Sequence, residues 1–436
     1  AGKNVKVYDV TPGKDGSVAR ETCRQRYLEA GGRIVEVRRA GELRLEEGQV
    51  VVDALFGAGL NRPVKGVYAE VVETMNESGL PIVALDMPSG LMGEDNGEND
   101  GAIVNAVRTI TFQFPKLALM FADNYPHVGE WTVVDIGLNP DVLSETASRY
   151  YFLDRDRVAM RLRTPGKFAH KGTEGHTLLI VGSEKMQGAA VLATGGALRS
   201  GAGLVSVLLN FSNDSVFRMK MPEVLLRSPL AWNFEERITD KYQSVAIGPG
   251  FDMTALSEER MWKILKEGYT GKMVLDADAL NLLSTHPEWW THIPKEAVLT
   301  PHPKEFERLA GKSRNNFERL NKLSTFAQEH DVVMVLKGAH TVIASPDGRC
   351  FFNTSGTPGM AKGGSGDALT GIIAALLASG HEPLDAAIVG VFAHGLAGEK
   401  AAGRYGVRGM KAGDVAEALG EAWKELESYK NKDLCL

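Results

Sequence analysis

Cysteine is scarce in this sequence, and long apolar runs are absent. The chain has 436 residues but only three cysteines, Cys23, Cys350 and Cys435, which lie far apart. Their number and spacing exclude a disulfide framework and a cysteine-based metal site, and they predict a reducing, cytoplasmic setting. The longest apolar run, around residues 372–378, is far shorter than the ~20 residues that cross a bilayer. We therefore expect no membrane segment, and no stretch is typical of a signal peptide.

An excess of positive charge is also missing. The net charge is −6 and no cluster of Lys and Arg stands out, which argues against a nucleic-acid partner. There is no Walker A loop, no zinc-ligand spacing and no Ser-His-Asp arrangement. The composition, 44% hydrophobic and 24% charged, is that of a globular protein. The length predicts two or three domains, at ~150 residues for each.

The most informative stretch covers residues 353–380. Five glycines and one proline fall within residues 356–366, Asp367 follows at once, and residues 368–377 form an apolar helical run. Glycine allows the backbone to approach a ligand, and a helix that begins there points free N–H groups at an anion. A carboxylate beside such an anion site can take a proton from a hydroxyl while a phosphoryl group is held.

The same pattern has a simpler interpretation. Asp367 could be an ordinary N-cap that has no chemical role. The density of glycine and the added charge of Lys362 favour the functional interpretation.

The first 150 residues alternate between short apolar strands and helices, which predicts a parallel sheet covered on both faces. Ligands of such sheets bind beyond the carboxyl ends of the strands. Asp53, the loop 57–59, Asp86 and Ser89 all fall at predicted strand ends. Each could instead form a cap or a turn, but two strands that both end in Asp favour a site.

We place a domain boundary near residue 150, before a charged segment, 150–164, that we expect to be irregular. The second half then repeats the alternation, and five successive strand ends carry polar or glycine residues. These strand ends begin at Gly248, Asp276, Thr300 and Lys337 and at the turn 345–348. Core packing does not distinguish one end of a strand from the other, so the repetition predicts a second site. His302, between two prolines, fits a loop role as well as a ligand contact.

The second half, residues 151–436, resembles the ribokinase-like dehydratase domain of NAD(P)H-hydrate repair. The matching segments run in order through the half and include GSEKMQGAAVLATGG from residue 182, IGPG from 247, VLDADALNLL from 274, LTPHPKEFERL from 299, VLKGAHT from 335 and GTPGMAKGGSGDALTG from 356. The first half, residues 1–150, resembles the Rossmann-like NAD(P)H-hydrate epimerase domain through VVDALFGAGL from 51, ALDMPSG from 84 and ITFQFPKLAL from 110. Together they resemble the bifunctional repair enzyme.

The resemblance implies an activity for the second half. In the family that it resembles, the domain phosphorylates the hydroxyl of an (S)-NAD(P)H hydrate with ADP, and phosphate then leaves to restore NAD(P)H. Asp367 would be the base, and Glu305 is a candidate for binding Mg²⁺. The nucleotide would bind to Lys337, Gly338, Ala339, His340, Thr341, Gly363, Gly364, Ser365 and Gly366. The hydrate would contact Ala189, Gly250, His302 and Asp367.

For the first half the resemblance implies interconversion of the R and S hydrates. Asp86 and Lys116 would be catalytic, and Asp53 and Ser89 would bind K⁺. The hydrate would contact Gly57, Ala58, Gly59, Leu60, Asn61, Arg62, Pro63 and Asp86. The first strand and the Asn-Asn-Gly-Gly-Asp loop that open this domain in the family are missing before Ala1, so we expect about 50 further residues upstream, the size of one βαβ unit.

Two other functions fit the same fold. A vitamin or sugar kinase would release a stable phosphoester, and a nucleotide sensor would bind without reacting. The fused first half disfavours the kinase, and the placement of Asp367 disfavours the sensor, because binding alone needs no base. We expect small-molecule substrates and a homo-oligomer, with no nucleic-acid or membrane partner.

Overall fold

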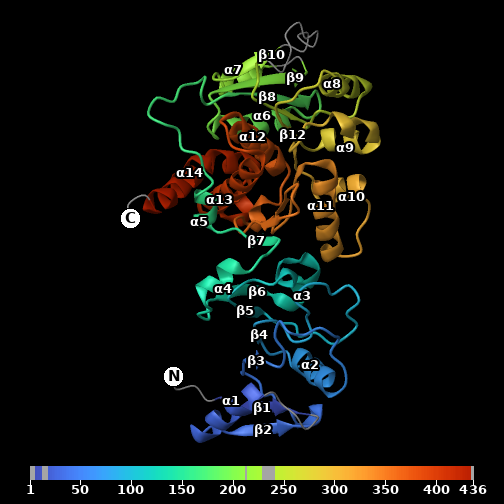
Figure 1. Ribbon diagram of the computed structural model, residues 1–436, viewed down its shortest axis with the longest axis vertical. Helices are drawn as coiled ribbons and strands as arrows, with labels where there is room; N and C mark the ends of the chain where they lie inside the picture. The colour runs from blue at the N-terminus through green and yellow to red at the C-terminus, as the bar shows by residue number, and fades with distance from the viewer. Residues whose placement is uncertain (1–4, 12–17, 212–213, 228–240, 434–436) are drawn as a thin grey trace. The chain divides into compact units, whose positions relative to one another are not determined.

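The computed structural model describes residues 5–11, 18–211, 214–227 and 241–433, which form two compact units (Figure 1). Unit 1 comprises Ala1–Ala147 with Arg314–Arg319, and unit 2 comprises Ser148–Ser313 and Leu320–Leu436. Each unit has its own sheet or sheets and its own core.

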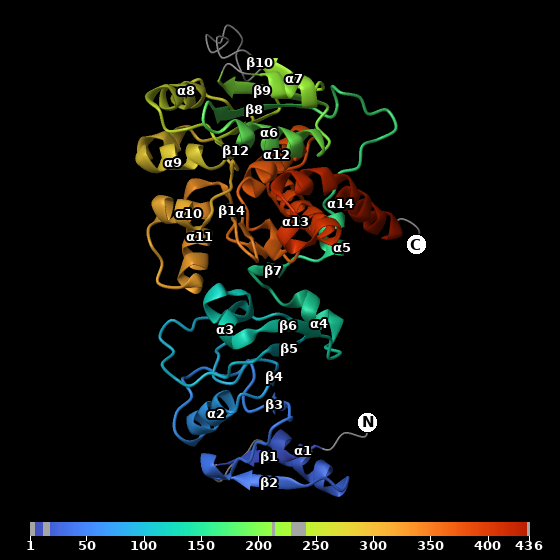
Figure 2. The same cartoon turned by 180° about the vertical axis from the view of Figure 1, so that it is seen from behind.

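Unit 1 contains two parallel sheets, β1-β2 and β3-β4-β5-β6. One core cluster joins them, because Val10 and Val37 of the small sheet pack with Val51 and Val72 of the larger part. In both ribbon views β1, rather than β2, lies on the side towards β3 (Figures 1 and 2). The elements are β1 (Val7–Val10), α1 (Val18–Glu29), β2 (Ile34–Val37), β3 (Val51–Asp53), α2 (Val67–Glu77), β4 (Ile82–Leu85), β5 (Arg108–Phe112), α3 (Tyr125–Val128), β6 (Glu130–Val134) and α4 (Pro140–Glu145).

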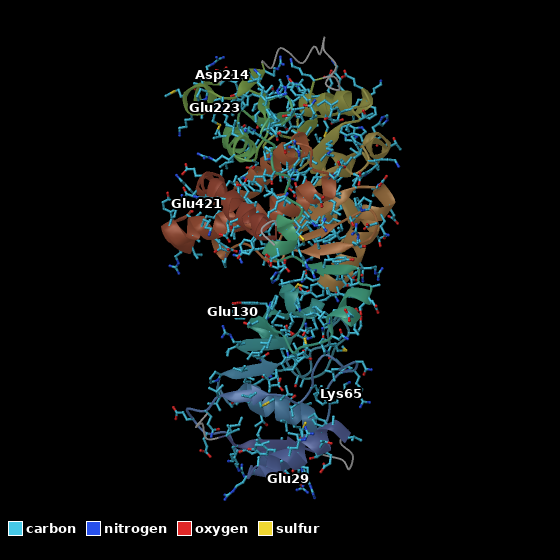
Figure 3. The ribbon with its side chains drawn as sticks, turned by 60° about the vertical axis from the view of Figure 1, so that its left-hand side comes forward. Glu29, Lys65, Glu130, Asp214, Glu223 and Glu421 are labelled. Atoms are coloured by element: carbon cyan, nitrogen blue, oxygen red, sulfur yellow. The ribbon has the colours of Figure 1, made fainter. Side chains whose placement is uncertain are left out.

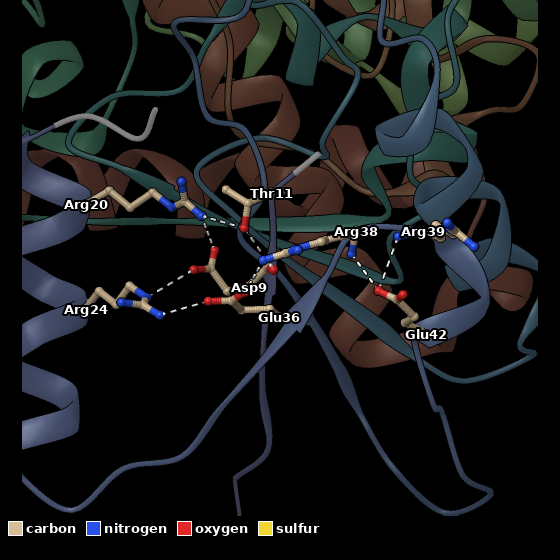
Figure 4. A network of polar contacts seen from close by, with 8 residues as sticks. All are labelled: Asp9, Thr11, Arg20, Arg24, Glu36, Arg38, Arg39 and Glu42. Carbon is tan, nitrogen blue, oxygen red and sulfur yellow. Dashed lines mark hydrogen bonds and ion pairs between the residues drawn. The ribbon is translucent and has the colours of Figure 1, made fainter. Parts of the chain in front are cut away.

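Charged side chains link α1 to the small sheet (Figure 4). No residue of α1 is fully buried. Arg20 forms an ion pair with Asp9 of β1, and Arg24 bonds Glu36 of β2 at 3.2 Å. Partly exposed ion pairs contribute only ~0–1 kcal/mol each to stability. The attachment of α1 to the small sheet is therefore less stable than packing through buried apolar side chains would make it.

Unit 2 is built on one ten-stranded sheet in the order β10-β9-β8-β11-β12-β13-β14-β15-β16-β7. The strands from β10 to β14 are parallel, and β15 is antiparallel to both of its neighbours. The strands are β7 (Tyr150–Phe152), β8 (His176–Ser183), β9 (Leu204–Asn210), β10 (Leu225–Arg227), β11 (Ser244–Ile247), β12 (Lys272–Leu275), β13 (Val298–Leu299), β14 (Val333–Leu336), β15 (Val342–Ala344) and β16 (Cys350–Phe352). Long apolar strands such as β8, buried along its whole length, are typical of a sheet covered on both faces.

Helices cover this sheet on two sides (Figures 1 and 2). Helices α6, α12, α13 and α14 pack with one another on one side, while α8, α9, α10 and α11 lie on the other. The helices are α5 (Arg155–Ala159), α6 (Gln187–Leu198), α7 (Ser215–Lys220), α8 (Ala255–Lys266), α9 (Asp278–Thr285), α10 (Pro303–Ala310), α11 (Asn316–His330), α12 (Ser365–Ala378), α13 (Pro383–Gly409) and α14 (Ala412–Asp433).

The prediction that residues 150–164 are irregular is wrong. This segment contains β7 and α5, and β7 pairs in parallel with β16, where the Tyr151 and Phe351 rings stack with centroids 4.9 Å apart. Both strands have three residues and lie 200 positions apart, so no local periodicity signals the pairing.

Helices α6 and α12 cross closely because both carry glycine at the contact. A Cβ atom on Gly371 would lie 1.8 Å from the carbonyl oxygen of Ala193, and one on Gly196 would lie 2.2 Å from that of Ala368. Real Cβ atoms do not approach backbone oxygens so closely, so a larger residue forces the helices apart.

We therefore expect Gly371→Ala to destabilise unit 2 by about 1–3 kcal/mol, the usual cost of overpacking. The matched control is Gly420→Ala, because Gly420 is exposed within α14 and its Cβ would meet nothing within 4 Å. This control should keep or raise the melting temperature, since Ala favours a helix over Gly by roughly 0.8–1.0 kcal/mol. Calorimetry that shows the same melting temperature for both variants would contradict the close crossing.

Charges of both signs are spread over the surface, as Lys65, Asp214 and Glu421 illustrate (Figure 3). Lys65 pairs with Asp100 at 2.9 Å and Arg404 pairs with Glu421. Among the described helices, none is both long enough and apolar enough to cross a membrane.

Candidate active sites

The polar strand ends of unit 2 meet at one edge of its sheet. Strands β8, β11, β12, β13 and β14 are adjacent and parallel, so their carboxyl ends lie side by side. The residues that follow them include Asp276, His302 and Lys337. This edge is where ligands of parallel sheets bind.

The glycine-rich stretch ends at the first turn of α12. Gly364 is the N-cap and has φ of +96°, a left-handed conformation that favours glycine. Asp367 is therefore the third residue of the helix, so the simpler interpretation of Asp367 as an N-cap is wrong. Within the described ranges, the N–H groups of Gly364, Gly366 and Asp367 have no hydrogen-bond acceptor. Free N–H donors at the start of a helix are suited to binding an anion, and we call this place the candidate anion site.

Asp367 is half-buried beside this anion site. Burial raises the pKa of Asp367 from 3.8 to about 6, and the negative charge of Asp276 adds to the rise while Lys337 opposes it. A carboxylate with this pKa is ionised at neutral pH and is a better base than an ordinary Asp.

Lys337 follows β14 and supplies positive charge to the site. Its ammonium group donates to Asp276 Oδ1 at 2.7 Å. Burial acts to lower the pKa of Lys337, but the negative charges of Asp276, Glu305 and Asp367 outweigh it and keep the pKa above its usual value. Lys337 is therefore fully charged at neutral pH.

His302 and Glu305 form a capping box at the start of α10. His302 Nδ1 accepts from the backbone N–H groups of Lys304 and Glu305, while the Glu305 carboxylate accepts from the backbone of His302 at 2.8 Å. His302 Nε2 lies 3.2 Å from Glu305 Oε1. Both ring nitrogens thus have neighbours within α10, which leaves the exposed face of the ring for a ligand. Burial raises the pKa of Glu305 against the effect of Lys337.

The residues expected to bind the nucleotide surround Lys337 and the start of α12. Gly338 and Thr341 close a turn between β14 and β15, with 3.2 Å between the Gly338 nitrogen and Thr341 Oγ1. Gly338 and Ala339 are exposed at this turn. His340 Nδ1 lies 3.3 Å from the carbonyl oxygen of Asn353, and burial lowers its pKa. Ser365 donates its hydroxyl to the carbonyl oxygen of Met360 at 2.9 Å, and its backbone N–H has the carbonyl oxygen of Lys362 at 3.5 Å. Both donors of Ser365 therefore have acceptors inside the loop.

Two residues expected to contact the hydrate lie against each other. A Cβ atom on Gly250, which has φ of +63°, would lie 2.9 Å from the Cβ of Ala189 in the first turn of α6. A side chain at position 250 would therefore collide with the start of α6. It would also reduce the space for a ligand at the carboxyl ends of the strands.

In unit 1 the structure brings Asp53 and Ser89 together. Ser89 donates its backbone N–H to Asp53 Oδ2 at 2.7 Å and its hydroxyl to Oδ1 at 2.6 Å. Both side chains are buried, and burial raises the pKa of Asp53 against these hydrogen bonds. No cationic side chain in the described part of the chain pairs with Asp53.

Asp86 and Lys116 form the second pair of unit 1. Lys116 Nζ donates to Asp86 Oδ1, to Thr111 Oγ1 at 2.9 Å and to the Phe112 carbonyl at 3.0 Å. Burial acts to raise the pKa of Asp86, but Lys116 and the N–H of Ala58 outweigh it and hold the pKa below its usual value. Asp86 has φ of +67°, a strained conformation of the kind found at functional sites.

The loop after β3 closes over Asp86. Ala58 donates its N–H to Asp86 Oδ2 at 2.9 Å, and a Cβ on Gly57 would lie 2.8 Å from the same oxygen. Gly59, Asn61 and Arg62 are exposed, whereas Leu60 and Pro63 are half-buried. Gly57 and Ala58 thus contact a predicted catalytic residue, and the residues that follow them in the loop are exposed or half-buried.

Two charged residues have positions that the sequence did not predict. Lys362 was expected to add positive charge to the site, and Glu399 was given no role. Lys362 does not face the anion site, because its ammonium donates to the carbonyl oxygens of Arg408 and Met410 at the end of α13. Glu399 of α13 accepts from the N–H of Gly356 at 2.9 Å. The end of α13 and its Glu399 therefore contact the glycine-rich loop at two places, Gly356 and Lys362, and no spacing in the sequence signals this. Asp276 was recognisable as a polar strand end, but its pairing with Lys337 requires the fold.

Comparisons with known proteins match both units. A family model described as NAD(P)H-hydrate dehydratase matches residues 177–421, and one described as YjeF-related protein N-terminus matches residues 1–118. The chain is 34% identical to a bifunctional NAD(P)H-hydrate repair enzyme of Moorella thermoacetica, over 98% of this chain and 83% of the relative. It is 36% identical to the enzyme of the same description from Thermofilum pendens, again over 98% and 83%.

Solved structures resemble unit 2. An ADP/ATP-dependent NAD(P)H-hydrate dehydratase from Bacillus subtilis, co-crystallised with ATP and Mg²⁺, has 31% sequence identity and a TM-score of 0.56, and covers 64% of this chain and 100% of its own. A ribokinase-like superfamily protein from Enterococcus faecalis has 25% identity and a TM-score of 0.57, over 64% and 98%.

These matches confirm the expected fold, a Rossmann-like domain followed by a ribokinase-like domain, and the expected resemblance. With both family models in sequence order, and relatives that match nearly its whole length, the chain belongs to the family of bifunctional NAD(P)H-hydrate repair enzymes.

Proposed function

We propose that unit 2 dehydrates the (S) hydrates of NADH and NADPH at the expense of ADP, forming AMP and phosphate. The observation that carries this proposal is the position of Asp367. It combines a raised pKa with a place beside the unsatisfied N–H groups that begin α12. A base beside an anion site is what phosphorylation of a hydroxyl requires.

The reaction then runs in two steps. Asp367 takes the proton of the hydrate hydroxyl, whose oxygen attacks the β-phosphorus of ADP while the amides of Gly363–Gly366 hold the phosphoryl oxygens. AMP leaves. The C–O bond to the new phosphate group then breaks, a neighbouring ring carbon gives its proton to the departing phosphate, and the electrons of that C–H bond restore the ring double bond. Phosphorylation converts hydroxide, a poor leaving group, into phosphate, a good one.

The remaining residues of unit 2 bind the two substrates in this proposal. The turn 337–341 and the first turn of α12 bind the nucleotide, and Ala189, Gly250 and the ring face of His302 bind the hydrate. Mg²⁺ fits the site only as a partner of the nucleotide, because no group of three or more His, Cys, Asp or Glu side chains in the described residues could hold a metal. Mg²⁺ commonly binds through phosphates, waters and one or two carboxylates. The carboxylate that we propose for it is Glu305, whose Oε2 lies 3.8 Å from the Lys337 ammonium. When bound, the ion would neutralise phosphate charge.

Unit 1 interconverts the R and S hydrates in this proposal. The hydrate binds to the loop of residues 57–63, and the Asp86–Lys116 pair supplies a proton acceptor and a proton donor for proton transfer or ring opening. K⁺ fits at Asp53 and Ser89, because a buried carboxylate that has no cationic partner in the described residues needs a compensating charge. The ion would supply that charge and fix the loop. We further propose that the protein is a homo-oligomer and that it acts in the cytoplasm.

The phosphoryl donor gives a direct test. We expect the purified chain, given Mg²⁺ and the (S) hydrate, to consume ADP and to form AMP in step with the absorbance of the reduced nicotinamide ring. Chromatography of the nucleotides checks this result. If the chain turns over with ATP and not with ADP, ADP is not the phosphoryl donor, although the proposed mechanism of phosphorylation and elimination still holds. In a separate assay the chain is given the (R) hydrate in place of the (S) hydrate. If the (R) hydrate is never consumed, the proposed function of unit 1 is wrong.

A further inference from the structure

The ammonium group of Lys337 has more hydrogen-bond donors than it has acceptors among the described residues. Its one hydrogen bond among the described residues goes to Asp276 Oδ1 at 2.7 Å. Glu305 Oε2, at 3.8 Å, is near enough to attract the charge but too far away for a hydrogen bond. A lysine ammonium has three N–H donors, and the Lys337 side chain is only 21% exposed. Two donors in a largely buried place therefore remain for a ligand.

These donors lie beside the anion site. A Cβ atom on Gly366 would be 3.3 Å from Lys337 Nζ, and Gly366 is the second residue of α12. The ammonium and the unsatisfied N–H groups of the first turn thus lie next to each other. A phosphoryl group bound there would meet both.

Thr370 fixes the other side of this arrangement. It lies one turn beyond Gly366 on α12, is fully buried, and donates its hydroxyl to Asp276 Oδ2 at 2.6 Å. Asp276, 1% exposed, thus bonds Lys337 with one oxygen and Thr370 with the other. The chain of contacts ties β12, β14 and α12 together at the site.

We propose that Asp276 and Thr370 are positioning residues that hold the Lys337 ammonium at the first turn of α12, where it neutralises the charge that develops on the transferred phosphoryl group. The inference rests on the phosphoryl transfer proposed above. The ammonium lies among several carboxylates, because Asp276, Glu305 and Asp367 all act on it. A loosely held ammonium would turn towards Glu305 or Asp367, whereas a charge fixed before the reaction stabilises the transition state without reorganisation.

The variant that removes this contact is Thr370→Val, because Val has the shape of Thr and lacks only the hydroxyl. The same hydroxyl also lies 3.3 Å from the carbonyl oxygen of Gly366, one turn back on α12, so the control must remove a contact of that second kind. Thr370→Ser restores the hydroxyl. The matched control is Thr194→Val on α6, because Thr194 is equally buried and, among the described residues, its hydroxyl donates only to the carbonyl oxygen of Ala190, one turn back on the same helix, at 2.7 Å. All three are assayed as the whole chain, with Mg²⁺, ADP and the (S) hydrate, by initial rates of AMP formation.

We expect Thr370→Val to lower kcat at least ~10-fold, the effect of a modest loss of transition-state stabilisation, and to change the KM for ADP less than ~3-fold. Thr370→Ser and Thr194→Val should stay within ~3-fold of the unsubstituted chain in both constants. A purely structural role would lower activity in both valine variants together with their melting temperatures. That result, or a Thr370→Val kcat within twofold of normal, overturns the inference alone. A chain that forms no AMP without any substitution overturns the proposed function as well.

Discussion

Replacing Asp367 with Asn should lower the rate of dehydration by at least ~10²-fold, the low end for the loss of a general base. Asn has the size of Asp and can still accept a hydrogen bond, but it cannot take a proton from the hydrate hydroxyl. AMP formation and the return of NADH absorbance should fall together, because both depend on phosphoryl transfer.

The fold should survive this change. Asp367 is the third residue of α12 and Gly364 caps the helix, so no capping interaction is lost. The raised pKa means that the folded protein holds the proton of Asp367 more tightly than the unfolded chain does. Ionised Asp367 therefore costs stability at neutral pH, and this cost disappears as the pH falls from about 6 to below 3.8. Asp367→Asn should melt at the same temperature as the parent or higher at pH 7.

Two measurements separate loss of the base from general damage. Epimerisation by unit 1 should be unchanged in Asp367→Asn, and the parent chain should lose kcat as the pH falls through about 6, because protonated Asp367 cannot act as a base. A variant that turns over at nearly the normal rate would show that Asp367 is not the base.

The second large effect is expected in unit 1. Asp86→Asn should lower the enzymatic rate of (R) to (S) conversion by roughly 10²-fold, since the carboxylate and its charged bond to Lys116 are lost. Asn tolerates positive φ better than most residues, so it suits the +67° of Asp86. Its side-chain oxygen can still accept from Ala58.

Dehydration provides the internal control for this variant. Asp86→Asn should consume the (S) hydrate with ADP at the parent rate, because unit 2 has its own core and site. Rates without protein give the background for the (R) hydrate. If the variant epimerises as fast as the parent, the catalytic role of Asp86 is wrong. If it loses both activities, the substitution has damaged the fold.

The sequence predicted the parts of this molecule that depend on local patterns. Most strands were recognised from short apolar runs, and the strand ends at Asp53, Asp86 and Lys337 were identified because a parallel sheet gathers such residues at one edge. The existence of α12 was predicted from the apolar run at residues 368–377, but the helix begins three residues earlier, at Ser365, inside the glycine-rich stretch. The motifs of the family then supplied the substrates, which neither composition nor periodicity could give.

Contacts between distant segments were not predictable in the same way. The pairing of β7 with β16 joins two three-residue strands, and neither has room for a periodic pattern. Lys362 stands among the site glycines in the sequence, yet its ammonium donates to two carbonyl oxygens at the end of α13, a segment more than 40 positions away. The bond from Thr370 to Asp276 spans 94 positions, and only the packing of α12 against β12 explains it.

If unit 2 transfers the β-phosphate of ADP to the hydrate and then expels it, the β-phosphorus must pass through the hydrate. The most direct measurement follows ADP labelled in its β-phosphate during turnover with the (S) hydrate and Mg²⁺. We expect the label to end in inorganic phosphate, with AMP, phosphate and NADH formed in equal amounts. Label that stays on a stable phosphorylated dinucleotide, with no NADH formed, would identify a kinase and contradict the proposed dehydration.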